Sequence, residues 1–196
     1  FDIPDSWPRI CGIDFGFDHP TAIVWGAINP ENGCFYIVDE YRESRQTAVE
    51  HAIAIRARPN QPPIAWPHDG NRTFDGGDSM AQQYRQEGVN FLPEHFTNPP
   101  DISQTKGDIK ISAGITALTR AMQKGLFKVF QSCHFWQQEY GTYHFGDNGK
   151  IVDKEDDLMS ATRYAFQSQR FAQASESNKK RRPWETEETN NYNWVT

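Results

Sequence analysis

Short apolar runs alternate along this chain with longer segments of mixed polarity. Residues 10–14, 21–28 and 34–41 are apolar runs joined by short turn-forming sequences, of which 29–33 is the clearest. Three apolar runs joined in this way predict an antiparallel meander of three strands at the start of the fold.

The segment that follows, residues 46–56, has apolar residues at helical spacing. We predict a helix there, with Ser44 as its N-cap and with Val49, Ile53 and Ile55 on its buried side. The remaining pattern predicts short strands at 64–69, 89–92 and 126–130, helices at 79–86, 106–124, 133–141 and 154–166, and a hairpin around 146–149. Gly125 is expected to end the longest of these helices.

Three acids stand where predicted elements end or begin. Asp14 ends the first strand, Asp69 ends the fourth, and Asp157 lies at the start of the last helix beside Asp156. Because a helix precedes the fourth strand, we expect that strand to run parallel to the first and to bring Asp69 to the same sheet edge as Asp14. The order of elements is that of the ribonuclease-H-like (integrase-type) α/β fold, a mixed sheet of five or more strands flanked by helices.

Each acid also has an ordinary structural explanation. Asp14 lies two residues before Gly16 and suits a turn, and acids in the first turn of a helix are favoured by its dipole. Taken together, however, the three positions favour a metal site, because three converging carboxylates can hold two divalent ions. Carboxylate and water ligands select Mg²⁺ or Mn²⁺ over zinc. Two such ions activate water and stabilise the leaving oxygen in phosphodiester hydrolysis.

Composition narrows the function classes. The chain has 196 residues, 37% of them hydrophobic, which is enough for one domain with a core of its own. Its formal net charge of −6 means that contact with nucleic acid would need a local basic patch and metal ions. The three cysteines form no Cys-x-x-Cys pair, which argues against a zinc knuckle and fits a reducing compartment. No run approaches the length of a membrane span, so we expect no membrane partner.

Three motifs carry a resemblance to a known family. They are Gly12-Ile13-Asp14-Phe15-Gly16, Pro67-His68-Asp69-Gly70 and the closing run Lys154-Glu155-Asp156-Asp157-Leu158-Met159-Ser160-Ala161-Thr162-Arg163-Tyr164-Ala165. With these motifs the chain resembles the C-terminal nuclease domain of the large terminase subunit of tailed bacteriophages, of the headful-packaging, short-tailed type. The resemblance covers residues 9–171.

The resemblance implies an endodeoxyribonuclease that cuts concatemeric double-stranded viral DNA at the start and end of packaging. It implies that Asp14, Asp69 and Asp157 are catalytic metal ligands for two Mg²⁺ ions, with Mn²⁺ able to substitute. Asp156 is an alternative third ligand, because sequence cannot place a helix start to one residue. Position 160 is Ser where many relatives have Asp, which removes one outer ligand.

The resemblance also implies a domain plan and partners. Residues 1–8 are expected to be a linker from an N-terminal ATPase domain, 9–171 the nuclease domain and 172–196 a flexible charged tail. The chain has no Gly-x-x-x-x-Gly-Lys-Ser/Thr phosphate loop, so this part is not the motor. The expected partners are the ATPase domain, the portal protein and the small terminase subunit, in the host cytoplasm during virus assembly.

Further residues are candidates for supporting roles. His68 adjoins Asp69, and Glu40 ends the third strand, so both are candidates for a second layer around the metal or for contact with DNA. Lys150 and Lys154 lie next to the acid pair and are candidates for DNA contact. The basic tail residues are candidates for docking to the portal or for nucleic-acid binding: Lys179, Lys180, Arg181 and Arg182.

Other functions compete with this interpretation. Actin-like kinases also open with an Asp-x-Gly hairpin, but they need a second lobe that this length does not provide. A resolvase or integrase of the same fold would use similar acids. A non-catalytic module that docks on the portal would use the acids only for a structural metal. Acid-to-Ala changes that leave cleavage intact would support the docking module, whereas the closing Ala161-Thr162-Arg163-Tyr164-Ala165 run and the tail favour the terminase over a resolvase or integrase.

Overall fold

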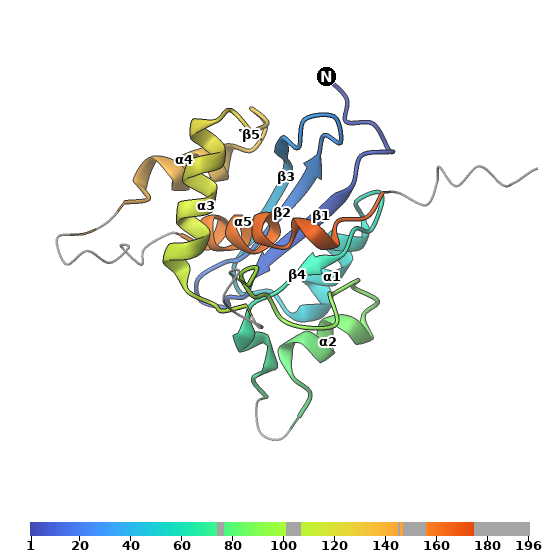
Figure 1. The fold of residues 1–196 in the computed structure, drawn as a ribbon. Helices are drawn as coiled ribbons and strands as arrows, with labels where there is room; N and C mark the ends of the chain where they lie inside the picture. The colour runs from blue at the N-terminus through green and yellow to red at the C-terminus, as the bar shows by residue number, and fades with distance from the viewer. Residues whose placement is uncertain (74–76, 101–106, 145, 147–155, 175–196) are drawn as a thin grey trace, which may run out of the picture.

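A five-stranded mixed sheet forms the centre of the computed structural model, which describes residues 1–73, 77–100, 107–144, 146 and 156–174 (Figure 1). The strands are β1 (Arg9–Asp14), β2 (Thr21–Ile28), β3 (Phe35–Glu43), β4 (Ile64–Ala65) and β5 (Phe127–Val129). Their order in the sheet is β4-β1-β2-β3-β5. The first three strands pair antiparallel, as predicted, whereas β4 runs parallel to β1 and β5 runs parallel to β3.

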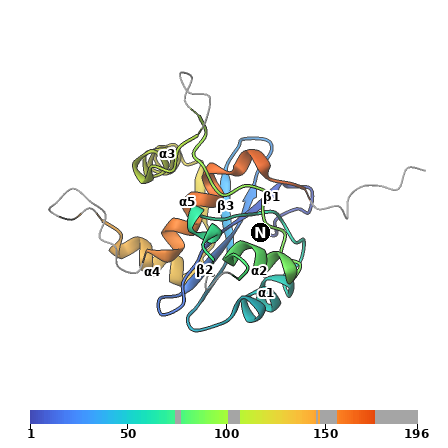
Figure 2. The same ribbon diagram turned by 90° about the horizontal axis from the view of Figure 1, so that it is seen from below.

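Helices cover both faces of this sheet (Figure 2). The helices are α1 (Ala48–Arg56), α2 (Met80–Gln86), α3 (Ile111–Gln123), α4 (His134–Thr142) and α5 (Asp157–Gln167), with short 3₁₀ turns η1 (His68–Asn71) and η2 (Gln169–Phe171). The core residues divide these elements into two groups, with α3, α4 and α5 packed on one face and α1 and α2 on the other. None of the helices in the described residues is long and apolar enough to cross a membrane.

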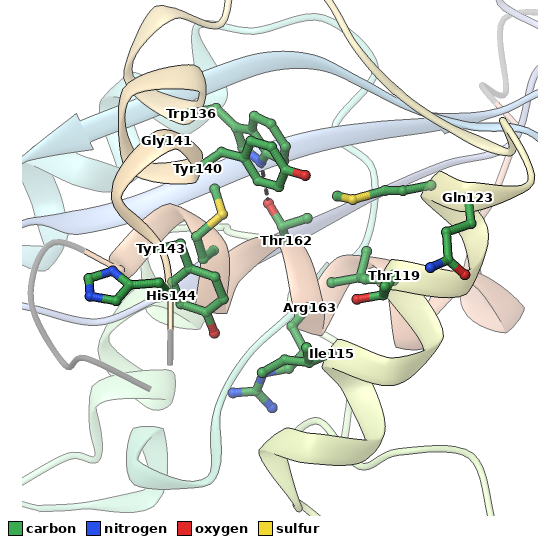
Figure 3. A pocket seen from close by; sticks show the side chains of 13 residues that line it. Ile115, Thr119, Gln123, Trp136, Tyr140, Gly141, Tyr143, His144, Thr162 and Arg163 are labelled. Atoms are coloured by element: carbon green, nitrogen blue, oxygen red, sulfur yellow. Dashed lines mark hydrogen bonds between the residues drawn. The ribbon is translucent and has the colours of Figure 1, made fainter. Parts of the chain in front are cut away.

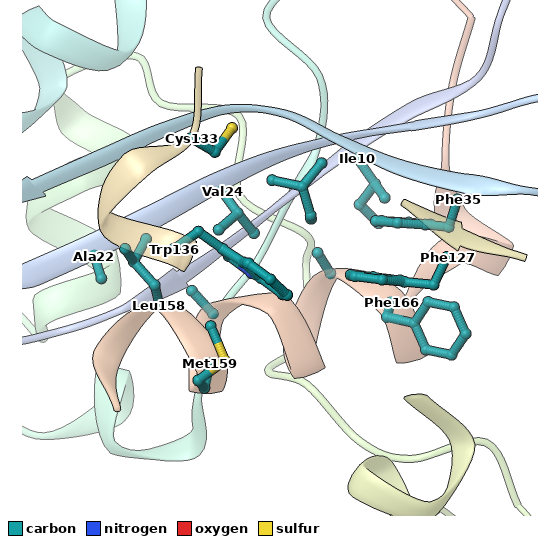
Figure 4. Packing of buried hydrophobic residues seen from close by; sticks show 13 residues of the cluster. Ile10, Ala22, Val24, Phe35, Phe127, Cys133, Trp136, Leu158, Met159 and Phe166 are labelled. Carbon is teal, nitrogen blue, oxygen red and sulfur yellow. The ribbon is translucent and has the colours of Figure 1, made fainter. Parts of the chain in front are cut away.

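The first face is built around α5 (Figure 4). Leu158, Met159 and Phe166 of α5 pack with Trp136 of α4 and Phe127 of β5 in one buried cluster. Beneath them the backbone of α5 lies directly on β1, and a Cβ atom added at Gly12 would come within 2.0 Å of the Ala161 carbonyl oxygen. Glycine on the strand and alanines on the helix therefore permit the close approach that sets the height of α5 above the sheet.

On the second face, α1 buries Ile55 as predicted but does not bury Val49 or Ile53. His51, Ala52 and Ile55 are buried, whereas Val49 and Ile53 are 47% and 56% exposed. The predicted N-cap is also wrong, because Thr47 caps the helix through a capping box with Glu50. A Thr with Glu three residues later satisfies two backbone N–H groups at once, which Ser44 has no partner to do.

Most other predicted elements are present with shifted ends. The predicted helix at 79–86 is α2, which Ser79 caps, and Gly125 ends α3 with φ of 69° as expected. The predicted strand at 89–92 makes only an isolated bridge from Phe91 to Ile64. The predicted hairpin around 146–149 lies almost wholly outside the described residues.

Candidate metal centre

The topology brings Asp14 and Asp69 to one edge of the sheet. Asp14 is the last residue of β1. Asp69 lies in η1, just after β4, and β4 pairs in parallel with β1 at Cys11 and Gly12. Because parallel strands end on the same side of a sheet, the two carboxylates lie near each other, as predicted from the order of elements.

Asp157 reaches the same region from the opposite end of the chain. It is the first residue of α5 and only 7% exposed. The packing of α5 on Gly12 fixes the helix over β1. Two nitrogen-bearing side chains approach the Asp157 carboxylate: His19 Nδ1 at 3.5 Å and Arg42 Nη2 at 3.7 Å.

The electrostatics show that these acids affect one another. Burial raises the pKa of Asp14 well above its ordinary value, and the charges of Asp69, Asp157 and Asp156, in that order, raise it further. Arg163 opposes this shift. Burial also raises the pKa of Asp157, against the lowering effects of Arg42 and His19. Negative charge is thus concentrated here beyond what the neighbouring cations balance.

The donor set fits a divalent cation. Carboxylate oxygens are the ligands of Mg²⁺ and Mn²⁺, and Asp69 Oδ1 is buried without a hydrogen-bond partner. A buried carboxylate oxygen without a donor is costly, and a bound cation removes that cost. Within the described residues, however, no three His, Cys, Asp or Glu side chains are gathered closely enough to hold a metal ion.

The other predicted candidates lie in varied surroundings. His68 is exposed, with its ring edge-on to His95 at 4.9 Å. The Glu40 carboxylate accepts hydrogen bonds from the backbone N–H groups of Phe135 and Trp136, so it caps α4. Asp156 is the N-cap residue of α5. Lys150, Lys154 and the four basic tail residues fall outside the described part of the chain.

Two residues that the sequence did not single out contact this region. Glu139 on α4 is 4% exposed, and its carboxylate accepts the Leu158 N–H at 2.8 Å. Burial raises the pKa of Glu139 to about 7. Its other oxygen lies 3.0 Å from Arg42 Nε, an ion pair that lacks the alignment of a hydrogen bond. No local pattern marks either residue, because each partner lies far away in the sequence.

Two hollows flank α5. One of about 270 Å³ adjoins the candidate centre and is lined in part by His68, Asp69, Arg163 and Tyr164. The other, of about 570 Å³, lies between α3, α4 and α5 and is mostly apolar (Figure 3). None of the candidate ligands lines the larger hollow, so size alone does not mark the site.

Comparisons with known proteins agree on the fold. The Terminase RNaseH-like domain family matches residues 11–169. The large terminase subunit of Salmonella phage P22 is 36% identical over 173 residues, which are 88% of this chain and 34% of that protein. This chain therefore spans about a third of the length of that relative.

Solved structures give the same answer. The nuclease domain of the P22 large terminase superposes with a TM-score of 0.80 at 35% identity, covering 90% of this chain and 89% of that one. The large terminase nuclease domain of bacteriophage SPP1, solved with bound Mn, shares the fold with a TM-score of 0.61 at 17% identity, covering 83% of this chain and 86% of that one. The predicted ribonuclease-H-like fold is confirmed.

Proposed function

Since this chain belongs to the Terminase RNaseH-like domain family, as its motifs predicted, we propose that it is the metal-dependent endonuclease of a viral DNA-packaging motor. One observation carries the proposal: the end of β1, the turn after β4 and the start of α5 bring Asp14, Asp69 and Asp157 to one edge of the sheet. The three acids come from three separate elements, and the charges of Asp69 and Asp157 act on Asp14. A shared cation explains them.

In this proposal Asp14, Asp69 and Asp157 hold two Mg²⁺ ions, and Mn²⁺ is able to replace them. Bound there, the ions would supply an activated water and stabilise the leaving oxygen of a phosphodiester. The chain's own part is to hold the carboxylates on rigid elements and to limit the water around them. Asp157, which is 7% exposed, has the smallest exposed fraction of the three, and burial has its stronger effect on the pKa of Asp14. Asp156 is the alternative third ligand.

The substrate is concatemeric double-stranded viral DNA, cut to start and to end packaging. The net charge of −6 argues that affinity for DNA comes from local contacts and from neighbouring parts of the motor. We assign residues 1–8 to a linker from an ATPase domain, 9–171 to the nuclease and 172–196 to a tail that docks on the portal. The small terminase subunit is a further partner, and the setting is the host cytoplasm.

The test is plasmid cleavage with Mn²⁺, with Mg²⁺ or with EDTA. We expect metal-dependent linearisation that Asp14→Asn, Asp69→Asn and Asp157→Asn each abolish, because each removes a ligand charge without changing side-chain size. Asp39→Asn is the matched control, since its carboxylate pairs with Arg58 on the α1 side of the sheet. If Asp156→Asn stops cleavage and Asp157→Asn does not, the third ligand is Asp156. Cleavage that survives all three changes would refute the proposal.

A further inference from the structure

Glutamate side chains from two different elements tie α4 to its neighbours. Glu40 on β3 accepts the N–H groups of Phe135 and Trp136, at 2.9 and 2.7 Å, in the first turn of α4. Near the other end of α4, Glu139 accepts the Leu158 N–H in the first turn of α5. One carboxylate thus fixes where α4 begins, and a second carboxylate, carried by α4 itself, reaches α5.

The bond from Glu139 replaces a cap that α5 lacks. The first N–H groups of a helix have no partner inside the helix and need one from elsewhere. The N-cap residue Asp156 makes no side-chain cap bond, so Glu139 supplies the acceptor from another helix. A carboxylate at this end of α5 is also favoured by the helix dipole. Leu158 directly follows Asp157 in the chain. The hydrogen bond from Leu158 N–H to Glu139 therefore fixes the backbone next to Asp157, the third candidate ligand.

Arg42 fixes which way the Glu139 carboxylate points. Its Nε lies 3.0 Å from Glu139 Oε1, and the other oxygen, Oε2, accepts the Leu158 N–H. Arg42 follows Glu40 by two residues on β3, so both side chains leave the strand on the face that α4 covers. Strand β3 therefore holds the first turn of α4 through Glu40 and holds Glu139, near the last turn of α4, through Arg42.

We propose that Glu139 is a positioning residue for the metal centre: by capping α5 from α4, it sets the place from which the Asp157 carboxylate meets the ions. This inference rests on the metal-dependent nuclease function proposed above. Glu139 touches neither ion nor DNA in this role. Outer partners of this kind matter because a ligand held in place loses little freedom when the metal binds.

The experiment measures Mn²⁺ binding by calorimetry on the whole chain, with Glu139→Ala compared with Glu139→Gln. Gln keeps an oxygen that accepts the Leu158 N–H, whereas Ala keeps none. We expect Glu139→Ala to weaken Mn²⁺ binding by about ten- to a hundredfold and Glu139→Gln to restore most of the affinity. The plasmid cleavage rate of Glu139→Ala should come closer to that of the unaltered chain at saturating Mn²⁺ than at low Mn²⁺. Arg58→Gln, which disturbs an ion pair on the other face of the sheet, should leave both quantities unchanged.

A second measurement works without metal. Hydrogen exchange at the Leu158 amide should speed up in Glu139→Ala and stay slow in Glu139→Gln. If Glu139→Ala does not fold, Glu139→Asp takes its place, because the shorter side chain cannot span the same distance, and the same weakening is expected.

Failure of this inference differs from failure of the proposed function. If the unaltered chain binds no Mn²⁺ and cuts no DNA, the nuclease proposal fails. If the unaltered chain binds and cuts, and the alanine or aspartate variant matches it, the positioning role is overturned. Equal weakening by Arg58→Gln would also overturn it, because the loss would then follow general stability rather than the position of Asp157.

Discussion

Strand β3 contributes to an arginine–carboxylate cluster on each face of the sheet, and the two clusters differ in the ratio of arginines to carboxylates. On the α1 side, Arg58 pairs with Asp39 at 2.6 Å and donates to the carbonyl oxygens of Ala54 and Glu40. Its guanidinium also lies 4.2 Å from the centre of the Trp25 ring. One cation meets one anion there, and each of the three Arg58 nitrogens donates a hydrogen bond.

On the α5 side, a single arginine serves two acids. Arg42 approaches both Glu139 and Asp157, and its Nε makes no aligned hydrogen bond. Asp14 and Asp69 add negative charge nearby. A paired and hydrogen-bonded arginine is accounted for as a structural contact, whereas buried carboxylates in excess of their cationic partners cost free energy and are typical of functional sites. The comparison therefore points to the α5 side as the functional one.

The largest effect is expected from separating α5 from the sheet with Gly12→Val. Its Cβ atom would meet the Ala161 carbonyl and the Ala165 nitrogen, both of them backbone atoms that cannot rotate away. We expect a loss of roughly 3 kcal/mol in the free energy of unfolding, measured by urea denaturation. Gly141→Ala is the matched control, because nothing lies within 4 Å of its added Cβ. A neutral Gly12→Val would mean that α5 does not rest on β1 as described.

Smaller changes in Tm, of opposite sign, are expected from one substitution in each cluster. Arg58→Ala removes a bonded cation that packs on Trp25, so we expect a loss of about 1–2 kcal/mol, or a few degrees in Tm. Asp14→Asn relieves repulsion among buried carboxylates, so the Tm of the metal-free protein should rise. Calorimetry in EDTA measures both. A fall in Tm for Asp14→Asn would show that its charge is already balanced.

The smallest expected effect is on the pH dependence of stability, for which the contributions of the two faces of the sheet have opposite signs. On the α1 side, burial lowers the pKa of His51, which contacts Tyr41, stacks on Tyr84 and follows Glu50. The unfolded chain then binds the proton more readily, so this contribution to stability is lost as the pH falls below about 6.5. On the α5 side, the raised pKa of Glu139, near Arg42 and Asp157, favours the protonated folded state and acts in the opposite direction between about pH 4.5 and 7.

Unfolding curves of the metal-free chain across this pH range test both signs. His51→Gln should make the protein less sensitive to acid, and Glu139→Gln should remove a gain in stability on acidification. Parallel pH profiles for both variants and the unaltered chain would contradict the assignment.

The positions of Asp14 and Asp157 followed from the sequence because Asp14 ends β1 and Asp157 begins α5, whereas Asp69 lies in the η1 turn, beyond the end of β4 at Ala65. Apolar runs bounded by turn residues set β1, β2 and β3, and Asp14, at the end of the first run, is the last residue of β1. The parallel placement of β4 followed from the helix that precedes it, and with it the approach of Asp69 to Asp14.

Only the tertiary structure decided what surrounds those acids. The buried side of α1 depends on where the sheet lies, so Val49 and Ile53 were placed wrongly although the helix itself was predicted. Arg42 and Glu139 meet only because α4 packs beside β3, and Glu139 reaches α5 only because Gly12 lets that helix settle on the strand. Local propensity acts over a few residues. Helix caps and ion pairs between residues far apart in the sequence depend on tertiary contacts, which no local sequence pattern indicates.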